Sequence, residues 1–132
     1  MAEAEVEYFS FELVNRARGQ EGSGELSYDD TLSAVAREYS RRMRDGGFFS
    51  HVDPQGQSFS DRLRQAGVHV TVAGENLAIV EGSGSPASNA HRAFLDNPGH
   101  RANILDGRFT HGGVGVARRG DSYWITQLFA RR

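Results

Sequence analysis

The sequence predicts an α/β or α+β layered domain, and three observations support that prediction. The chain has 132 residues, enough for one domain with a core of its own. Apolar residues recur at helical spacing near the N-terminus, whereas they alternate with a period of two toward the C-terminus. Helical and strand-like segments are interspersed, as in domains whose helices cover a sheet. We therefore expect four helices and about three strands in one domain spanning residues 1–132.

The first half of the chain predicts three helices. Apolar side chains at helical spacing favour an amphipathic helix over residues 4–18, which the following glycines end. A second helix begins after Asp29 or Asp30 as its N-cap and ends at a glycine pair. Ser58 and the acidic residue three positions later resemble a capping box, which starts a short helix that stops at Gly67.

The second half predicts strands around one further helix. Valines at alternate positions favour a strand over residues 68–72, with Gly74 as an interruption before residues 77–80 continue it. The Ser-Pro pair at 85–86 is typical of a helix start, and this helix ends at the Asn-Pro-Gly run 97–99. Alternating residues on both sides of an Arg-Gly-Asp turn predict a hairpin at the C-terminus.

Composition argues against several classes of function. The net charge is −2, from 15 basic and 17 acidic side chains, which argues against nucleic-acid binding and against a polybasic membrane anchor. No apolar run reaches the length of a membrane span. The chain has no cysteine, so disulfides and cysteine metal sites are both excluded. This absence fits a cytosolic protein and also a bacterial secreted domain that needs no disulfide.

Three motifs place an imidazole or a carboxylate beside a turn-forming residue: SHVDPQG (50–56), GENLA (74–78) and GHRANIL (99–105). Their chemically active members are His51, Glu75 and His100. Two imidazoles and a carboxylate are the ligands of many divalent-metal sites and the reacting groups of many acid/base sites. A fold that gathers these three side chains therefore predicts such a site.

Each motif also has a structural interpretation. His51 fits a turn residue, Glu75 fits an acceptor for loop amides, and His100 fits a helix cap. Asn76 is expected to tie down backbone, with Arg101 and Asn103 holding neighbouring loops. Three further histidines are expected on the surface, the last of them as a rival ligand near a strand start: His69, His91 and His111. The chain has no HExxH helix and no GxSxG nucleophile elbow.

Five motifs in register resemble bacterial domains of the CAP superfamily, which groups cysteine-rich secretory proteins, antigen 5 and plant pathogenesis-related protein 1. The motifs are SHVDPQG, AGENLA, NPGHRANIL, FTHGGVGVA and YWITQLF. The resemblance extends from about Phe9 to Phe129. It implies an α+β fold, a three-layer α-β-α sandwich with a central, mostly antiparallel sheet. It also implies a cleft lined by two histidines and two acids.

The resemblance assigns three cleft residues directly. His51 matches the first histidine, Glu75 matches the acid of the GEN motif, and His100 matches the second histidine. These three are the expected metal ligands, and they are expected to bind the ligand of the cleft as well.

The fourth cleft position departs from the family pattern. Eukaryotic members have a glutamate in a W-x-x-E segment, and this chain has Phe-Leu-Asp-Asn at residues 94–97. With Phe94 in the place of the tryptophan, Asn97 stands where the glutamate does. A register shifted by one residue puts Asp96 there instead. Both residues are therefore candidates for ligand binding.

The resemblance also implies a function and a location. The expected function is a secreted or envelope-facing binding module whose cleft holds a divalent cation, zinc first, and a small, lipid-like or cell-envelope ligand. The alternative is a metal-assisted, protease-like hydrolase that uses the same cleft. A third interpretation is an interaction domain whose motifs only hold loops. For a secreted or envelope-facing protein, we expect Met1 to be a start placed after a removed leader.

Overall fold

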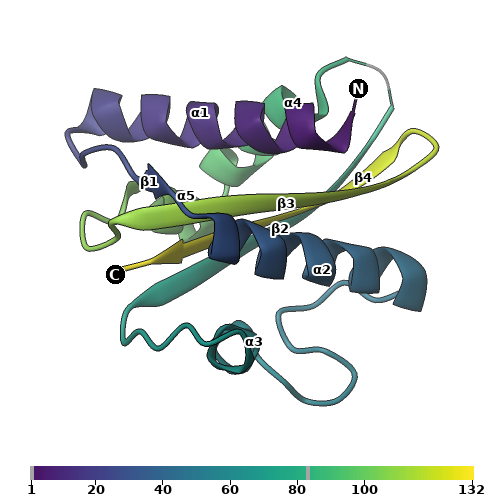
Figure 1. Ribbon diagram of the computed structural model, residues 1–132. Coiled ribbons are helices and arrows are strands. Elements are labelled where there is room, and N and C mark those ends of the chain that lie inside the picture. The colour runs from purple at the N-terminus through teal and green to yellow at the C-terminus, as the bar shows by residue number, and fades with distance from the viewer. Residues whose placement is uncertain (1, 83) are drawn as a thin grey trace.

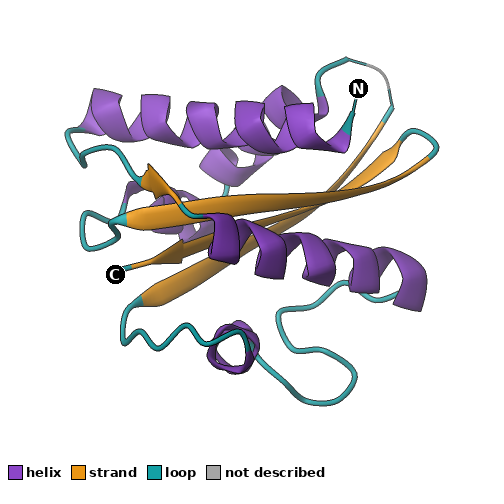
Figure 2. Cartoon of the chain, in the orientation of Figure 1, coloured by secondary structure: helices purple, strands orange, loops and turns teal. Residues whose placement is uncertain are grey.

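Helices cover both faces of a four-stranded sheet, so the structure has three layers (Figure 1, Figure 2). It is a computed structural model, and it describes residues 2–82 and 84–132. The helices are α1 (Glu3–Glu21), α2 (Asp30–Gly46), α3 (Phe59–Gln65), α4 (Pro86–Asp96) and α5 (Pro98–Leu105). The strands are β1 (Ser27–Tyr28), β2 (Ala73–Glu81), β3 (His111–Arg119) and β4 (Ser122–Ala130). Because α1, α4 and α5 pack on one face and α2 and α3 on the other, the predicted α-β-α sandwich is confirmed.

The helix ends follow from capping groups in the sequence. Asp29 is the N-cap of α2, and its side chain accepts a hydrogen bond at 2.9 Å from a backbone N–H of the first turn. Ser58 and Asp61 form the predicted capping box at α3. Helix α1 continues beyond its predicted end, because Gly19 stays helical and the chain turns only at Gly22, whose φ of +76° is left-handed.

The sheet is mostly antiparallel, as predicted. Its strand order is β1-β3-β4-β2, in which β4 pairs antiparallel with both β3 and β2. β3 and β4 form the predicted C-terminal hairpin. β1 pairs parallel with β3, and the sequence pattern does not predict it because two residues are too short to show alternation. β2 therefore lies at one edge of the sheet.

The strand predicted over residues 68–72 is wrong, because β2 begins only at Ala73. Val68 packs in a cluster with Leu63 of α3, and its N–H donates to the Leu63 carbonyl at 2.9 Å. Val68 and Val70 thus pack in the cluster of Leu63 outside the sheet, whereas Val72 packs in the other core cluster and its carbonyl accepts a hydrogen bond from the N–H of Arg131 at 3.0 Å. Alternation reports which side chains are buried, and it does not report what the backbone pairs with.

Gly74 does not interrupt β2, contrary to the prediction, and lies inside it. A Cβ atom at this position would lie 3.0 Å from Asn103 Oδ1 and 3.1 Å from the ring of Phe109. Glycine is present here because α5 and the following loop pack closely on this face of the strand.

Helix α2 approaches the sheet at glycines of β3. A Cβ atom at Gly115 would lie 1.9 Å from the backbone N of Arg37, so only glycine allows α2 to lie at this depth. The buried Glu7 of α1 fastens the same region. Its carboxylate accepts hydrogen bonds from Arg37 Nε and Nη2, at 2.9 and 2.7 Å, and from the N–H of Val116 at 2.9 Å. One carboxylate therefore joins α1, α2 and β3.

Over the part of the chain that the structure describes, no helix combines the length and the apolar character that a membrane crossing requires.

Candidate functional site

Three segments from different layers meet at the edge strand β2. His51 lies in the loop between α2 and α3, Glu75 lies in β2, and His100 lies in α5. Successive side chains of a strand point to opposite faces. Glu75 therefore faces the layer of α2 and α3, while Asn76 faces the layer of α5. The two histidines approach β2 from opposite faces of the sheet.

His51 and Glu75 form a hydrogen-bonded pair. Nδ1 of His51 donates to Glu75 Oε1 at 2.8 Å. The two side chains differ sharply in exposure, because that of His51 is 51% exposed and that of Glu75 is fully buried. A carboxylate only accepts hydrogen bonds, so in a neutral ring the proton is on Nδ1. The lone pair of Nε2 is then free for a ligand, a proton or a metal ion.

Arg62 of α3 holds this pair, and the sequence analysis did not identify it. Its Nη1 donates to Glu75 Oε2 at 2.7 Å, and its Nη2 donates to the backbone carbonyl of His51 at 2.9 Å. The Arg62 side chain is 5% exposed, so the ion pair is almost dry. The guanidinium balances the charge of the buried carboxylate and also fixes the loop that carries His51.

Tyr39 of α2 lies beneath the guanidinium. The Cζ atom of Arg62 is 3.2 Å from the centroid of the Tyr39 ring, a stacked cation–π contact. Burial raises the pKa of Tyr39, so the phenol keeps its proton and donates to the Ser50 carbonyl. Tyr39 and Arg62 therefore each fix a backbone carbonyl of the His51 loop. A tyrosine on an apolar helix stripe and an arginine within a short helix give no motif, which explains why sequence analysis missed them.

Asp53 shapes the rest of the loop. Its buried carboxylate accepts hydrogen bonds at 2.9 Å from the N–H groups of Gln55 and Gln57 and from Arg42 Nη2. The hydrogen bond from the Gln57 amide, with those from Arg42 and Gln55, holds the pKa of the Asp53 carboxyl below its usual range. The turn that follows His51 is therefore centred on the Asp53 carboxylate.

Asparagines hold His100 on the other face of β2. Nδ2 of Asn76 donates to the backbone carbonyl of His100 at 3.1 Å. Nδ2 of Asn103 donates to Asn76 Oδ1 at 2.9 Å and to the Glu75 carbonyl at 3.2 Å. These contacts confirm the positioning roles predicted for both asparagines. These hydrogen bonds therefore attach α5, which carries His100, to β2, which carries Glu75.

The His100 ring is partly buried beside an aromatic side chain. Phe94 meets it edge to face, with ring centroids 5.3 Å apart. Burial lowers the pKa of His100, and the charge of His51 lowers it further. Both effects favour the neutral form of His100.

The two candidates for the fourth cleft position have different surroundings. Asn97 is the N-cap of α5, where its Oδ1 accepts the N–H groups of Gly99 and His100 at 3.0 and 3.2 Å. It is therefore a local positioning residue for His100. Asp96 is the exposed last residue of α4. Ligand contact by Asp96 or Asn97 stays a prediction.

The remaining histidines lie outside the cleft. His69 is exposed, and His111 begins β3, as expected. His91 was expected on a solvated helix face, and this expectation is wrong. It is partly buried in α4, and its Nδ1 is buried without a hydrogen-bond partner among the described residues. This burial lowers the pKa of His91.

The described residues contain no group of three or more histidine, aspartate and glutamate side chains placed to hold a metal ion. At the cleft this agrees with the contacts of Glu75, whose two carboxylate oxygens are bonded to Arg62 and His51. Glu75 therefore orients His51, and binding of a cation by His51 and His100 stays a prediction. Glu75 as a direct ligand stays a prediction.

Two exposed apolar side chains flank the polar cleft in sequence. Phe49 is 51% exposed and Val52 is 50% exposed, on either side of His51. Exposed large apolar residues beside a cluster of buried polar groups are typical of binding sites for small molecules.

Residues 11–129 match the sequence profile of CAP, the cysteine-rich secretory protein family. The chain belongs to the CAP family. Bacillus subtilis YkwD is 38% identical to this CAP chain over 120 residues, which cover 91% of it and 45% of YkwD. An extracellular protein of Bacillus anthracis that contains an SCP domain is 33% identical, with a TM-score of 0.84 over 98% of this chain and 41% of that protein. The chain thus spans less than half of either relative.

Two further structures share the CAP fold at low identity. An outer surface protein of Borrelia burgdorferi has a TM-score of 0.89 at 20% identity, and the match covers 100% of this chain and 96% of that protein. NaASP2, crystallised with Zn²⁺, has a TM-score of 0.60 at 13% identity, and the match covers 97% of this chain and 78% of that one.

Proposed function

We propose that this CAP chain is a ligand-binding module that acts outside the cytoplasm, with its ligand in the cleft of His51, Glu75 and His100. The observation that carries the proposal is the exposed His51 ring held by a fully buried carboxylate. Orienting one exposed imidazole with a dry ion pair is costly in free energy, which favours a role for the free nitrogen. The extracellular Bacillus anthracis relative supports the proposed location.

The ligand class follows from the imidazoles and from the exposed apolar residues that flank His51 in sequence. The imidazoles offer hydrogen bonds to an oxygen-bearing group, and the side chains of Phe49 and Val52 offer apolar contact. A small or lipid-like molecule with a polar head and an apolar body matches both. A component of the cell envelope has this chemistry.

A divalent cation fits the same site, and zinc is the cation we expect there before others. Imidazole nitrogen is a preferred zinc donor, and His51 and His100 each offer one. The neutral form of His100 that its surroundings favour is the form that binds metal. When bound, such a cation acts as a Lewis acid toward an oxygen of the ligand. The zinc in NaASP2 supports this choice of metal.

Calorimetric titration with zinc tests the site. We expect saturable binding to the wild type and none to the double variant His51→Ala/His100→Ala. The matched control is His69→Ala/His111→Ala, which removes two histidines outside the cleft and should keep the wild-type affinity. Equal zinc affinity in both double variants would rule out the cleft as the zinc site. Titration with amphipathic lipids, using the same variants, tests the ligand class separately.

A metal-assisted hydrolase is the second candidate, because a histidine oriented by a carboxylate also suits general base catalysis. It predicts turnover of peptides or esters that requires metal and is lost in Glu75→Ala. Zinc-loaded protein that binds ligand without turnover across a broad substrate panel would rule against it.

A further inference from the structure

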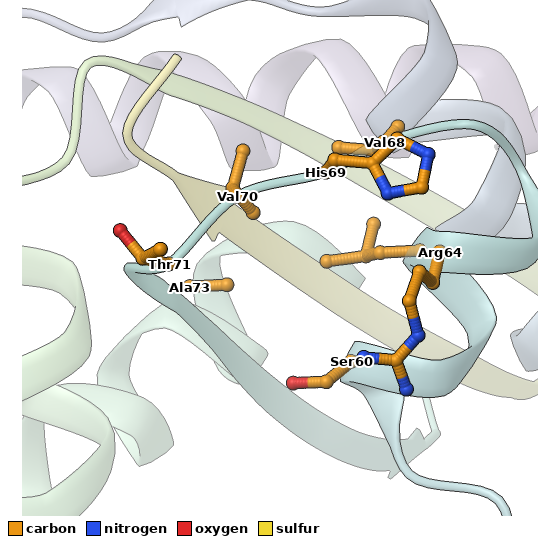
Figure 3. Close-up of a pocket in the computed structure, with 8 residues that line it drawn as sticks. Ser60, Arg64, Val68, His69, Val70, Thr71 and Ala73 are labelled. Carbon is orange, nitrogen blue, oxygen red and sulfur yellow. The ribbon is translucent and has the colours of Figure 1, made fainter.

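A second hollow lies between α3 and the segment 68–73 that leads into β2 (Figure 3). Its volume is about 280 Å³, which suits a small molecule. None of its lining residues belongs to the His51–Glu75 cleft. Arg64 and Ser60 project from α3, and His69 and Thr71 project from the segment that leads into β2 (Figure 3). The hollow is therefore separate from the site of the proposed function.

Apolar side chains form the inner wall of this hollow. Leu63 is 1% exposed and Val68 is 3% exposed, and both belong to the cluster that packs α3 against the sheet. Ala73, the first residue of β2, also lines the hollow. A ligand that covers these side chains removes apolar surface from water.

Hydrogen-bond donors without partners lie around the same wall. Among the described residues, the Arg64 guanidinium makes a single hydrogen bond, from Nη2 to Asp61 Oδ1 at 2.5 Å. The backbone N–H groups of residues 69–71 have no protein partner within the described chain, because this segment is not part of the sheet. No acidic side chain lines the hollow. Arg64 is therefore the lining side chain with a permanent charge, which favours a ligand that accepts hydrogen bonds.

The charge of the ligand follows from Arg64 and its partner. A guanidinium pairs well with a carboxylate or a phosphate. The carboxylate of Asp61, held at the start of α3 by Ser58, already offsets part of the charge of Arg64. The Arg64–Asp61 pair is formally neutral, so the free N–H groups of the guanidinium suit a single negative charge better than the double charge of a phosphate.

We propose that this hollow binds a small organic monocarboxylate. Its apolar body lies against Leu63 and Val68, and its carboxylate accepts hydrogen bonds from Arg64 and from the rim formed by Ser60, His69 and Thr71. This site goes beyond the proposed function and does not require the His51 cleft or a metal.

Amide NMR spectra of the whole chain, titrated with benzoate, test the proposal. We expect saturable shifts at residues 60–73, with weaker binding of neutral benzamide and of acetate, which lacks the apolar body. Arg64→Gln should weaken benzoate binding about fivefold to tenfold, as loss of a partly exposed ion pair does. The matched control is Arg92→Gln on α4, because Arg92 also makes one exposed hydrogen bond and lies outside the hollow. It should keep the wild-type affinity.

A second variant covers the case in which Arg64→Gln disturbs the start of α3. Thr71→Glu adds a negative charge at an exposed rim position, so it should weaken benzoate binding by about tenfold through charge repulsion while the melting temperature is kept. The proposal is overturned by shifts centred on the His51 cleft, by equal affinity for benzamide, or by wild-type affinity in either variant. Absence of saturation overturns it as well. None of these results bears on zinc binding at the cleft.

Discussion

The chain contains two buried glutamates, each paired with an arginine, and they differ in their third partner. Glu7 is bonded to Arg37 and to the backbone N–H of the buried Val116, so its third partner is internal. Glu75 is bonded to Arg62 and to the imidazole of His51, half of which is exposed. The comparison shows that a buried ion pair alone marks structure. An ion pair whose last hydrogen bond orients an exposed side chain marks a candidate site.

Removing the arginines is expected to have the largest effect. Arg62→Leu leaves the Glu75 carboxylate buried without its cation, which should lower the free energy of unfolding by about 3–5 kcal/mol. Arg37→Leu should cost less, because the Arg37 side chain is 32% exposed and water reaches the pair. Chemical denaturation of both variants checks this order. Equal losses would show that the two carboxylates are desolvated to the same degree.

Replacing each glutamate by glutamine separates the two ion pairs by their effect on zinc binding. Glu75→Gln and Glu7→Gln should each destabilise the fold by about 1–3 kcal/mol, since each leaves a buried donor with a poorer partner. Only Glu75→Gln should also weaken zinc binding, because the amide no longer orients His51 as a carboxylate does. Denaturation and calorimetry on the same samples separate the two effects. Weaker zinc binding in Glu7→Gln would contradict the distinction drawn between the two pairs.

Tyr39→Phe tests the support beneath Arg62. The ring stays under the guanidinium, and only the hydrogen bond to the Ser50 carbonyl is lost. We expect a loss of about 1 kcal/mol in the free energy of unfolding. Zinc affinity should fall modestly, because the loop that carries His51 becomes less fixed. Ser40→Ala is a control in the same helix, since Ser40 bonds to the sheet and not to the loop.

The smallest expected effect is a dependence of stability on pH. Burial lowers the pKa of both His91 and His100 below the ordinary value of 6.5. The unfolded chain then binds more protons than the folded chain once the pH falls below about 6.5, so stability is full above that pH and declines below it. Denaturation midpoints between about pH 7.5 and about pH 5.5 measure the decline. His91→Gln should reduce it, and an unchanged slope would show that His91 does not contribute.

Much of the fold was predictable because its signals are local. Asp29 and Ser58 indicate helix starts through short-range hydrogen bonds, and the hairpin of β3 and β4 lies between adjacent segments. The strand expected over residues 68–72 fails because Val68 and Val70 pack in the cluster of Leu63 of α3, and β2 begins only at Ala73. β1 has too few residues for any pattern. Local rules therefore predict elements well and predict pairing between distant segments poorly.

In the candidate site, too, local motifs were predictable and contacts between distant segments were not. His51, Glu75 and His100 were identified because they stand in recognisable motifs. Arg62 and Tyr39 were not, because nothing in a helical stripe reveals which buried carboxylate an arginine will reach. The charge on Glu75 implied a partner, yet the chain has 15 basic residues and their spacing along the sequence does not select one. Only the packing of α3 against β2 does so.

The position of β2 at the edge of the sheet has a consequence for the order of assembly. The two imidazoles come from different helical layers, so neither layer by itself contains both of them. Under the proposed function, a ligand that contacts both imidazoles binds only the chain in which both layers have docked on the sheet, so it stabilises that form alone.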